Sequence, residues 1–363
     1  MAKKIKISLN GFEITTKKGT TILEVALEND VYIPHLCHHP DLIPVGVCRL
    51  CGVEIEGRGL VMSCLTETTD GMIIKTDTSS VTAQRRGALE LLIANHHGDC
   101  LSCSKNETCE LLKIAAFVGI DQSRLDQLRK PEELLPVDSS NPFFIFDPNK
   151  CVLCGICVRT CDEIQGRQAI DFIHRGYETK IGTAGDKPFV ESNCESCGEC
   201  VIRCPVGSLA SKDYKKPSYE VATVCPYCGV GCGINLGVQG NQLVKVTGNR
   251  EASANNGSLC VKGRFGITFV DHPDRVTKPM VRNYLLNGGK RKKKSDRGEW
   301  VEVDWDTALD IVAEKFVDIK KSTGSDAIGL LASAKCTNEE NYLMQKFARQ
   351  IIGTHNIDHC ARL

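Results

Sequence analysis

Apolar and polar residues recur along the chain in patterns that predict its first elements. Residues Lys4–Asn10 alternate apolar and polar side chains, and the Asn10–Gly11 pair that follows favours a turn, so a β-hairpin is expected. A short helix is predicted over residues 21–29. A longer helix that leads to His96 and His97 is predicted from apolar residues sharing one face: Val81, Ala88, Leu89, Leu92 and Ile93.

The C-terminal segment has the pattern of an α/β domain. An amphipathic helix is predicted from about Asp306, with Gly324 as its C-terminal signal and an apolar stripe of Leu309, Val312, Phe316 and Ile319. Asp326–Ser333 reads as an apolar strand, and a second helix is expected from Asn338, its predicted N-cap, to Gly353. A strand between two such helices predicts the opening of an α/β domain.

Net charge and hydropathy narrow the class of protein. The formal net charge is zero, which argues against nucleic acid or an anionic membrane as the main partner. The basic run Lys290–Lys294 is interpreted as a solvated loop. No apolar run reaches the length of a membrane span, and the first residues carry no export signal, so a cytoplasmic protein with reduced thiols is expected.

The cysteines change this picture, because 19 of the 21 fall into five spaced groups. Four groups hold four cysteines, and His96 completes the group of three. Thiolates in such groups are usually metal ligands. The five predicted ligand sets are Cys37, Cys48, Cys51 and Cys64; His96, Cys100, Cys103 and Cys109; Cys151, Cys154, Cys157 and Cys161; Cys194, Cys197, Cys200 and Cys204; and Cys225, Cys228, Cys232 and Cys260. Of the two cysteines left over, Cys336 is interpreted as a structural thiol and Cys360 as a packing residue.

The third and fourth groups form an internal repeat with the spacing of two-cluster bacterial ferredoxins. In that pattern the fourth cysteine of each run binds the other cluster. One [4Fe–4S] site should therefore combine Cys204 with the first three cysteines of the earlier run, and the other should combine Cys161 with the first three of the later run. Asp162 stands where the second run has Pro205, and a loop or hairpin is expected between the runs.

The first two groups resemble those of complex I-like and hydrogenase-like subunits. The Cys37 spacing resembles the plant-type [2Fe–2S] ferredoxins, with a longer first gap, and zinc is the alternative. The His96 spacing resembles the [4Fe–4S] motif with one histidine and three cysteines in the large iron–sulfur subunit of complex I. Taken without that resemblance, His96 could equally be a surface histidine. His97 is interpreted as a bystander.

The fifth group, "CPYCGVGC" with the later "CVKGR", resembles the N-terminal [4Fe–4S] domain of molybdopterin oxidoreductases. Zinc is again the alternative for the local pattern alone. The resemblance implies that Lys262 lies between the cluster and the pterin, where it would help to carry electrons and orient the cofactor. Without the family, Lys262 would read as an ordinary solvated lysine.

The last segment, "SAKCTNEENYLMQKFARQIIGTHNIDHCARL", closely resembles formate dehydrogenase catalytic subunits of the molybdenum/tungsten bis-pterin class. In that family "CARL" is followed at once by a metal-bound cysteine or selenocysteine. The resemblance thus implies no catalytic residue within 1–363 and the metal ligand at position 364. A selenocysteine codon read as a stop is the hypothesis for the chain end, and a UGA codon after Leu363 is its test; a truncated electron-transfer subunit is the alternative.

These resemblances together imply a multi-domain α+β protein. We expect a β-grasp [2Fe–2S] ferredoxin domain, a helical [4Fe–4S] domain, a connector, a two-[4Fe–4S] ferredoxin domain, the [4Fe–4S] domain of a molybdopterin oxidoreductase and the start of its α/β pterin-binding domain. The respective boundaries are 1–79, 80–120, 121–140, 141–216, 217–275 and 276–363.

The function implied is formate dehydrogenase or carbon dioxide reductase, with one [2Fe–2S] and four [4Fe–4S] clusters passing electrons from a molybdenum or tungsten bis-molybdopterin guanine dinucleotide site to a partner. The partner would be a flavin- and iron–sulfur-containing NAD(P) subunit, a ferredoxin or an iron-only hydrogenase. Two other classes stay open: the large iron–sulfur subunit of complex I, and the N-terminal arm of an iron-only hydrogenase. The ending of the chain argues against the former, and the Cys225 group does not match the latter.

Overall fold

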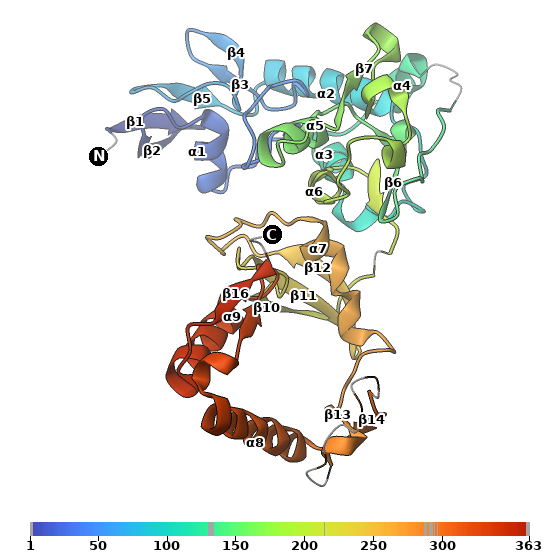
Figure 1. Ribbon diagram of the computed structural model, residues 1–363. Coiled ribbons are helices and arrows are strands. Elements are labelled where there is room, and N and C mark those ends of the chain that lie inside the picture. Colours follow the sequence, from blue (N-terminus) through green and yellow to red (C-terminus); the bar gives the residue numbers. More distant parts are fainter. Residues whose placement is uncertain are drawn as a thin grey trace. The chain divides into compact units, whose positions relative to one another are not determined.

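The computed structural model describes residues 3–129, 134–213, 215–286, 289, 293, 295 and 297–360. It forms two compact units, Met1–Tyr214 and Lys215–Leu363, each of which is described by itself (Figure 1). Most of the basic run at 290–294 and the last three residues of the chain lie outside the described residues. Residues 130–133 of the predicted connector also lie outside them.

The first unit begins with a five-stranded sheet of order β2-β1-β5-β3-β4. The strands are β1 (Lys4–Leu9), β2 (Phe12–Lys17), β3 (Gly52–Ile55), β4 (Gly59–Met62) and β5 (Ile73–Lys75). The predicted hairpin is confirmed, with Leu9 paired to Phe12 across the turn. Asn10 and Gly11 both have positive φ, at 54° and 88°, as the favoured two-residue hairpin turn requires.

Helix α1 (Ile22–Glu28) follows the hairpin and packs four residues into the core of this sheet: Ile22, Leu23, Val25 and Ala26. It starts with a capping box, because the Thr21 side chain accepts from the Glu24 backbone N–H and the Glu24 carboxylate accepts from the Thr21 N–H. The cap satisfies backbone donors that have no partner inside the helix, and it fixes the start of the helix close to the predicted residue 21.

The N-terminal part of helix α2 (Ser79–Ala94) contacts the sheet, and the later part of α2 contacts α3 and α4 (Figure 1). The connector predicted over 121–140 contains α4 (Gln122–Leu128), which follows α3 (Glu110–Val118). Asp121 caps α4 through the Arg124 N–H. The buried Glu90 carboxylate of α2 pairs with Arg124 at 3.0 Å, which ties α4 to α2.

The repeat folds into a two-cluster module. In each half, the cysteines precede and enter a short helix, α5 (Ile156–Arg159) or α6 (Glu199–Arg203). The segment expected between the runs is a hairpin of β7 (Ile170–Ile173) and β8 (Lys180–Thr183). Strands β6 (Phe144–Phe146) and β9 (Leu209–Ser211) pair at the two ends of the module. Cys161, in the run that lacks the proline, lies in a π-helical turn, Thr160–Ile164, that continues α5.

The second unit opens with the antiparallel sheet β10 (Tyr219–Val224), β11 (Gly233–Gln239) and β12 (Gln242–Gly248), followed by α7 (Val261–Phe265). A short hairpin of β13 (Met280–Arg282) and β14 (Trp300–Glu302) precedes α8 (Trp305–Thr323). Parallel strands β15 (Leu330–Ala332) and β16 (Ile357–His359) flank α9 (Asn338–Lys346). This strand–helix–strand order confirms the start of an α/β domain.

Details of the second unit correct the sequence predictions. The predicted N-cap Asn338 is the first helical residue of α9, and Thr337 is the cap because its hydroxyl forms a capping box with Glu340. The predicted helix to Gly353 changes to a π-helical turn after Lys346. The predicted strand over 326–333 begins with a 3-10 turn, and only Leu330–Ala332 pairs.

None of the helices in the described part of the chain has the length and apolar character that crossing a bilayer requires.

Removing the Thr21 cap tests the local argument for α1. We expect Thr21→Ala to lower the free energy of unfolding by about 1 kcal/mol, because the Glu24 N–H loses its acceptor. The measurement is the denaturant midpoint of the purified protein, with exposed Thr69→Ala as the matched control. Equal midpoints for the two variants would contradict the prediction.

Candidate iron–sulfur centres

The two-cluster module contains two cavities, each lined by one crossed set of cysteines. One cavity is lined by Cys161 of the first run together with Cys194, Cys197 and Cys200 of the second. The other is lined by Cys204 of the second run together with Cys151, Cys154 and Cys157 of the first. The structure thus brings together the two sets that the repeat predicted.

Both halves of the module shape the loop around the sulfur atoms in the same way. Leu153 and Gly155 have positive φ in the first run, and Ser196 and Gly198 have positive φ at the matching positions of the second. In this conformation the Leu153 N–H points at the Cys151 sulfur at 3.4 Å, and the Ser196 N–H points at the Cys194 sulfur at the same distance. Backbone N–H groups aimed at sulfur stabilise negative charge there, which suits thiolate ligands of a cluster.

Burial of these thiols makes them poor candidates for unliganded surface cysteines. Burial raises the pKa of the Cys151 thiol to about 11, and it raises the pKa of Cys157 and Cys200 well above the usual value. A buried thiolate needs a bound cation to offset the loss of water. The chemistry of the lining is therefore that of a site that binds metal and releases protons as it does so.

The group with one histidine also converges. His96, Cys100, Cys103 and Cys109 line a third cavity, and His97 is absent from its lining. The His96 Nδ1–H donates to the Lys150 carbonyl at 3.0 Å, which leaves Nε2 as the ligand atom.

Burial also lowers the pKa of His96, so the imidazole is neutral, as metal binding requires. Cys109 stands at the N-cap of α3, and the Glu110 N–H donates to the Pro205 carbonyl at 3.0 Å.

One segment of the module contributes to two of these cavities. Gly207 lines the His96 cavity, while Pro205, Val206 and Ser208 line the cavity of Cys151 and Cys204. A Cβ atom at Gly207 would stand 2.3 Å from the Cys103 sulfur, so only glycine permits this approach. The two sets of predicted ligands are thus separated by a short stretch of backbone.

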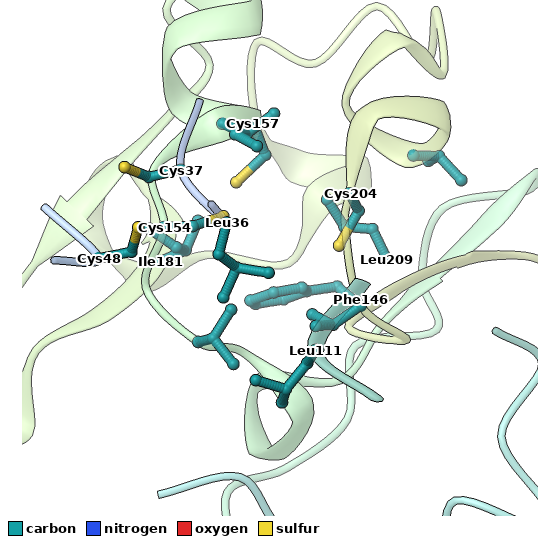
Figure 2. Packing of buried hydrophobic residues seen from close by; sticks show 14 of the residues in the cluster. Leu36, Cys37, Cys48, Leu111, Phe146, Cys154, Cys157, Ile181, Cys204 and Leu209 are labelled. Carbon is teal, nitrogen blue, oxygen red and sulfur yellow. The ribbon is translucent and has the colours of Figure 1, made fainter. Parts of the chain in front are cut away.

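The first group of cysteines lies at the junction of two hydrophobic cores. Cys51 and Cys64 belong to the core of the five-stranded sheet, with their sulfur atoms 3.3 Å apart. Cys37 and Cys48 belong to the core of the two-cluster module, and Figure 2 shows them beside Cys154, which lies in the same core.

The two pairs of that group are close enough to form one site. A hydrogen bond from the Cys48 thiol lowers the pKa of Cys37 to about 6. The pKa of Cys64 is raised by its hydrogen bond with Cys51, by burial and then by the charges of Cys51, Cys37 and Cys48. All four side chains are buried.

The fifth group lies in the second unit. Burial and then the neighbouring thiols of Cys225, Cys228 and Cys260 raise the pKa of Cys232, so the four thiols lie near one another. The Cys225 N–H donates to the Cys232 carbonyl at 2.8 Å, which closes the glycine-rich loop.

Helix α7 starts directly after Cys260, and its Lys262 is exposed. The Asn338 amide at the start of α9 donates to the Gly229 carbonyl at 2.8 Å, linking this loop to the α/β segment.

The arrangement of the ligand sets suits a multi-atom group. Among the residues described, no three His, Cys, Asp or Glu side chains converge tightly enough to hold a single metal ion. The crossed cysteines are instead distributed around two cavities. Together with the buried thiols and the N–H groups directed at sulfur, the residues present fit iron–sulfur clusters.

Several residues around these sites escaped the sequence analysis. Lys150 and Gly207 contact the His96 cavity, and Arg159 and Arg203 bridge the Cys37 loop to the module. Both arginines stand inside the ligand runs, and that position was the only available signal. The sequence does not show which residues of the Cys37 loop they contact, because those residues lie more than 100 positions away.

Family models cover most of the chain. The 2Fe-2S iron-sulfur cluster binding domain matches residues 2–79, the NADH-ubiquinone oxidoreductase-G iron-sulfur binding region matches 85–124, and the 4Fe-4S dicluster domain matches 150–208. The molybdopterin oxidoreductase Fe4S4 domain matches 219–272, and the molybdopterin oxidoreductase model matches 275–363. Residues 219–272 and 275–363 therefore carry domains of the molybdopterin oxidoreductases. The iron–sulfur and pterin domains that the sequence predicted are confirmed at this level.

Curated relatives and a solved structure also resemble the chain. A Bacillus subtilis protein named "Probable oxidoreductase YjgC" is 32% identical over the whole chain, which covers 40% of that relative. Staphylococcus aureus (strain N315) has a relative named "Putative formate dehydrogenase SA2102", also 32% identical and covered to 39%. A chain of an NAD+-reducing [NiFe]-hydrogenase, solved in the H2-reduced state, matches 57% of this chain and 87% of its own length, with a TM-score of 0.52 and 32% identity.

Substitution of the two adjacent histidines tests the cavity of Cys100, Cys103 and Cys109. We expect His96→Ala to lower the iron content by about four atoms per chain, because a [4Fe–4S] cluster loses a ligand. His97→Ala, the matched control, should keep its iron, since His97 does not line the cavity.

His96→Cys should keep the iron but shift the potential of this centre to lower values, because a thiolate adds negative charge. Iron analysis and a redox titration followed by electron paramagnetic resonance (EPR) are the measurements. Full iron content in His96→Ala would contradict the assignment.

Proposed function

We propose that the chain is part of a formate dehydrogenase or carbon dioxide reductase that interconverts formate and carbon dioxide plus two electrons. The observation that carries this proposal is the ending of the chain, which resembles formate dehydrogenase catalytic subunits, supported by relatives that bear that name. The chain spans about 40% of the length of these relatives. The reaction, at a molybdenum or tungsten bis-molybdopterin guanine dinucleotide site, is thus proposed for the longer protein.

The role proposed for residues 1–363 is to hold five iron–sulfur clusters, one [2Fe–2S] and four [4Fe–4S]. Such clusters, when bound, accept and donate single electrons. The ligands proposed for the [2Fe–2S] cluster are the four cysteines of the Cys37 set. The [4Fe–4S] clusters are assigned to the His96 set, to the two crossed sets of the module and to the Cys225 set.

The arrangement of these ligand sets in the first unit favours a junction over a simple line. Cys37 and Cys48 share a core with Cys154, while the segment after Cys204 also lines the His96 cavity. The set of Cys151, Cys154, Cys157 and Cys204 is therefore next to both of the N-terminal sets.

Partners are proposed from the N-terminal resemblance. The region 85–124 matches a segment of an NADH-ubiquinone oxidoreductase subunit, and the solved neighbour is a chain of an NAD+-reducing hydrogenase. These likenesses favour a complex with a flavin- and iron–sulfur-containing NAD(P) subunit. A ferredoxin or an iron-only hydrogenase would be the alternative electron partner.

Metal analysis of the complete, anaerobically purified enzyme tests the proposed function. We expect molybdenum or tungsten with pterin, about 18 iron atoms per chain if all five clusters are filled, and bleaching of the cluster absorbance by formate. Molybdenum or tungsten without a response to formate would support the pterin site but contradict formate as the substrate. Iron alone with hydrogen turnover would indicate a hydrogenase, and iron alone with quinone-linked activity would indicate a complex I-like conduit.

Lys262 offers a sharper test of the route from the pterin to the Cys225 set. We expect Lys262→Met to slow the reduction of the clusters by formate roughly 10- to 100-fold without loss of iron, because a residue that positions the cofactor would be missing. Lys321→Met, an exposed lysine of α8, is the matched control. Stopped-flow absorbance measures the rate, and wild-type rates in Lys262→Met would rule out the assigned role.

A further inference from the structure

The loop Cys37–Ile43 is held on the two-cluster module by side chains from the helices that carry the other ligands. Arg159, the last residue of α5, donates through Nη2 to the Cys37 carbonyl and through Nη1 to the Ile43 carbonyl, both at 2.6 Å. The two carbonyls stand at the two ends of the loop. One guanidinium group therefore fixes both ends.

Two more side chains complete this attachment. The Ile43 N–H donates to the carboxylate of Glu163 at 2.8 Å. Glu163 lies one helical turn after Arg159. Arg203 of α6 donates to the Asp41 carboxylate at 2.9 Å and also pairs with the buried Glu199. The Arg203 and Glu199 side chains are 3% and 0% exposed, so their pair lies out of water, where charges act more strongly. Asp41 is 26% exposed.

We propose that Arg159 is a positioning residue that seats the Cys37–Ile43 loop on the module and raises the reduction potential of the centre held by Cys37, Cys48, Cys51 and Cys64. The inference rests on the proposed function, which assigns a [2Fe–2S] cluster to these cysteines. It extends that function by naming a residue, outside the ligand sets, that controls the centre.

The charge and geometry of Arg159 support both parts of this role. A guanidinium is always charged and presents several N–H donors in a fixed fork, so it can bind two carbonyls at once while keeping its charge. A fixed positive charge next to a ligand favours the more negative, reduced state of a cluster. Glu163 binds the same end of the loop with the opposite charge, so its removal should move the potential in the opposite direction.

Four variants of the complete enzyme, purified anaerobically, test the proposal. Arg159→Gln removes the charge, Arg159→Lys keeps the charge but loses the fork, and Glu163→Gln removes the negative charge but keeps an acceptor. Exposed Arg58→Gln, in the turn between β3 and β4, is the control. The readouts are iron content and the midpoint potential of the [2Fe–2S] EPR signal in a redox titration.

We expect the midpoint potential to fall in Arg159→Gln, to stay closer to wild type in Arg159→Lys, to rise in Glu163→Gln and to be unchanged in Arg58→Gln. Wild-type potentials in both Arg159→Gln and Glu163→Gln would overturn the proposal. Shifts of the same sign would do so too, because they would report a disturbed loop and not charge.

If Arg159→Gln loses its [2Fe–2S] EPR signal, the sign of the shift in midpoint potential in Glu163→Gln decides whether the proposal stands. Loss of the signal in all three loop variants would reduce the role to folding and also overturn the proposal. A wild-type enzyme without a [2Fe–2S] signal would instead refute the proposed function.

Discussion

The convergence of buried cysteine sulfur atoms is the constraint on which the first unit depends. Thiols resist ionisation when they are buried, as the raised pKa values of Cys151 and Cys157 show. Several thiolates in one cavity would also repel one another. Bound metal removes both difficulties, so binding and folding are coupled in such a site. Much of the hydrophobic core of the first unit surrounds these side chains. The described part of the first unit has few long helices or strands that could stabilise it in their place.

Backbone conformation makes this convergence possible. Positive φ values at matched positions in the two runs turn N–H groups toward sulfur, and Gly207 lets one chain segment serve two cavities. Short helices then position the remaining cysteines. The sites are therefore formed by local loops whose shape repeats, while the sheet and the longer helices hold those loops in place.

The Cys37 set has a different character, because it joins two cores. Two of its cysteines pack with the five-stranded sheet and two with the two-cluster module. Hydrogen bonds from Arg159 and an ion pair of Arg203 hold the loop between them. A centre at such a junction is sensitive to how the two cores pack against each other. Residues that hold the junction can therefore control the reduction potential of the centre.

The sequence by itself determined the sets of cysteines, the crossed grouping, the first hairpin and the presence of the main helices, because these depend on spacing and on contacts between near neighbours. Thr337 replaced Asn338 as a cap because both are good cap residues and only the backbone geometry selects one. Only the tertiary structure decided that Cys37 and Cys48 lie beside Cys154, and that Gly207 approaches Cys103. Those contacts join residues about 100 positions apart, and neither periodicity nor spacing carries information over that distance.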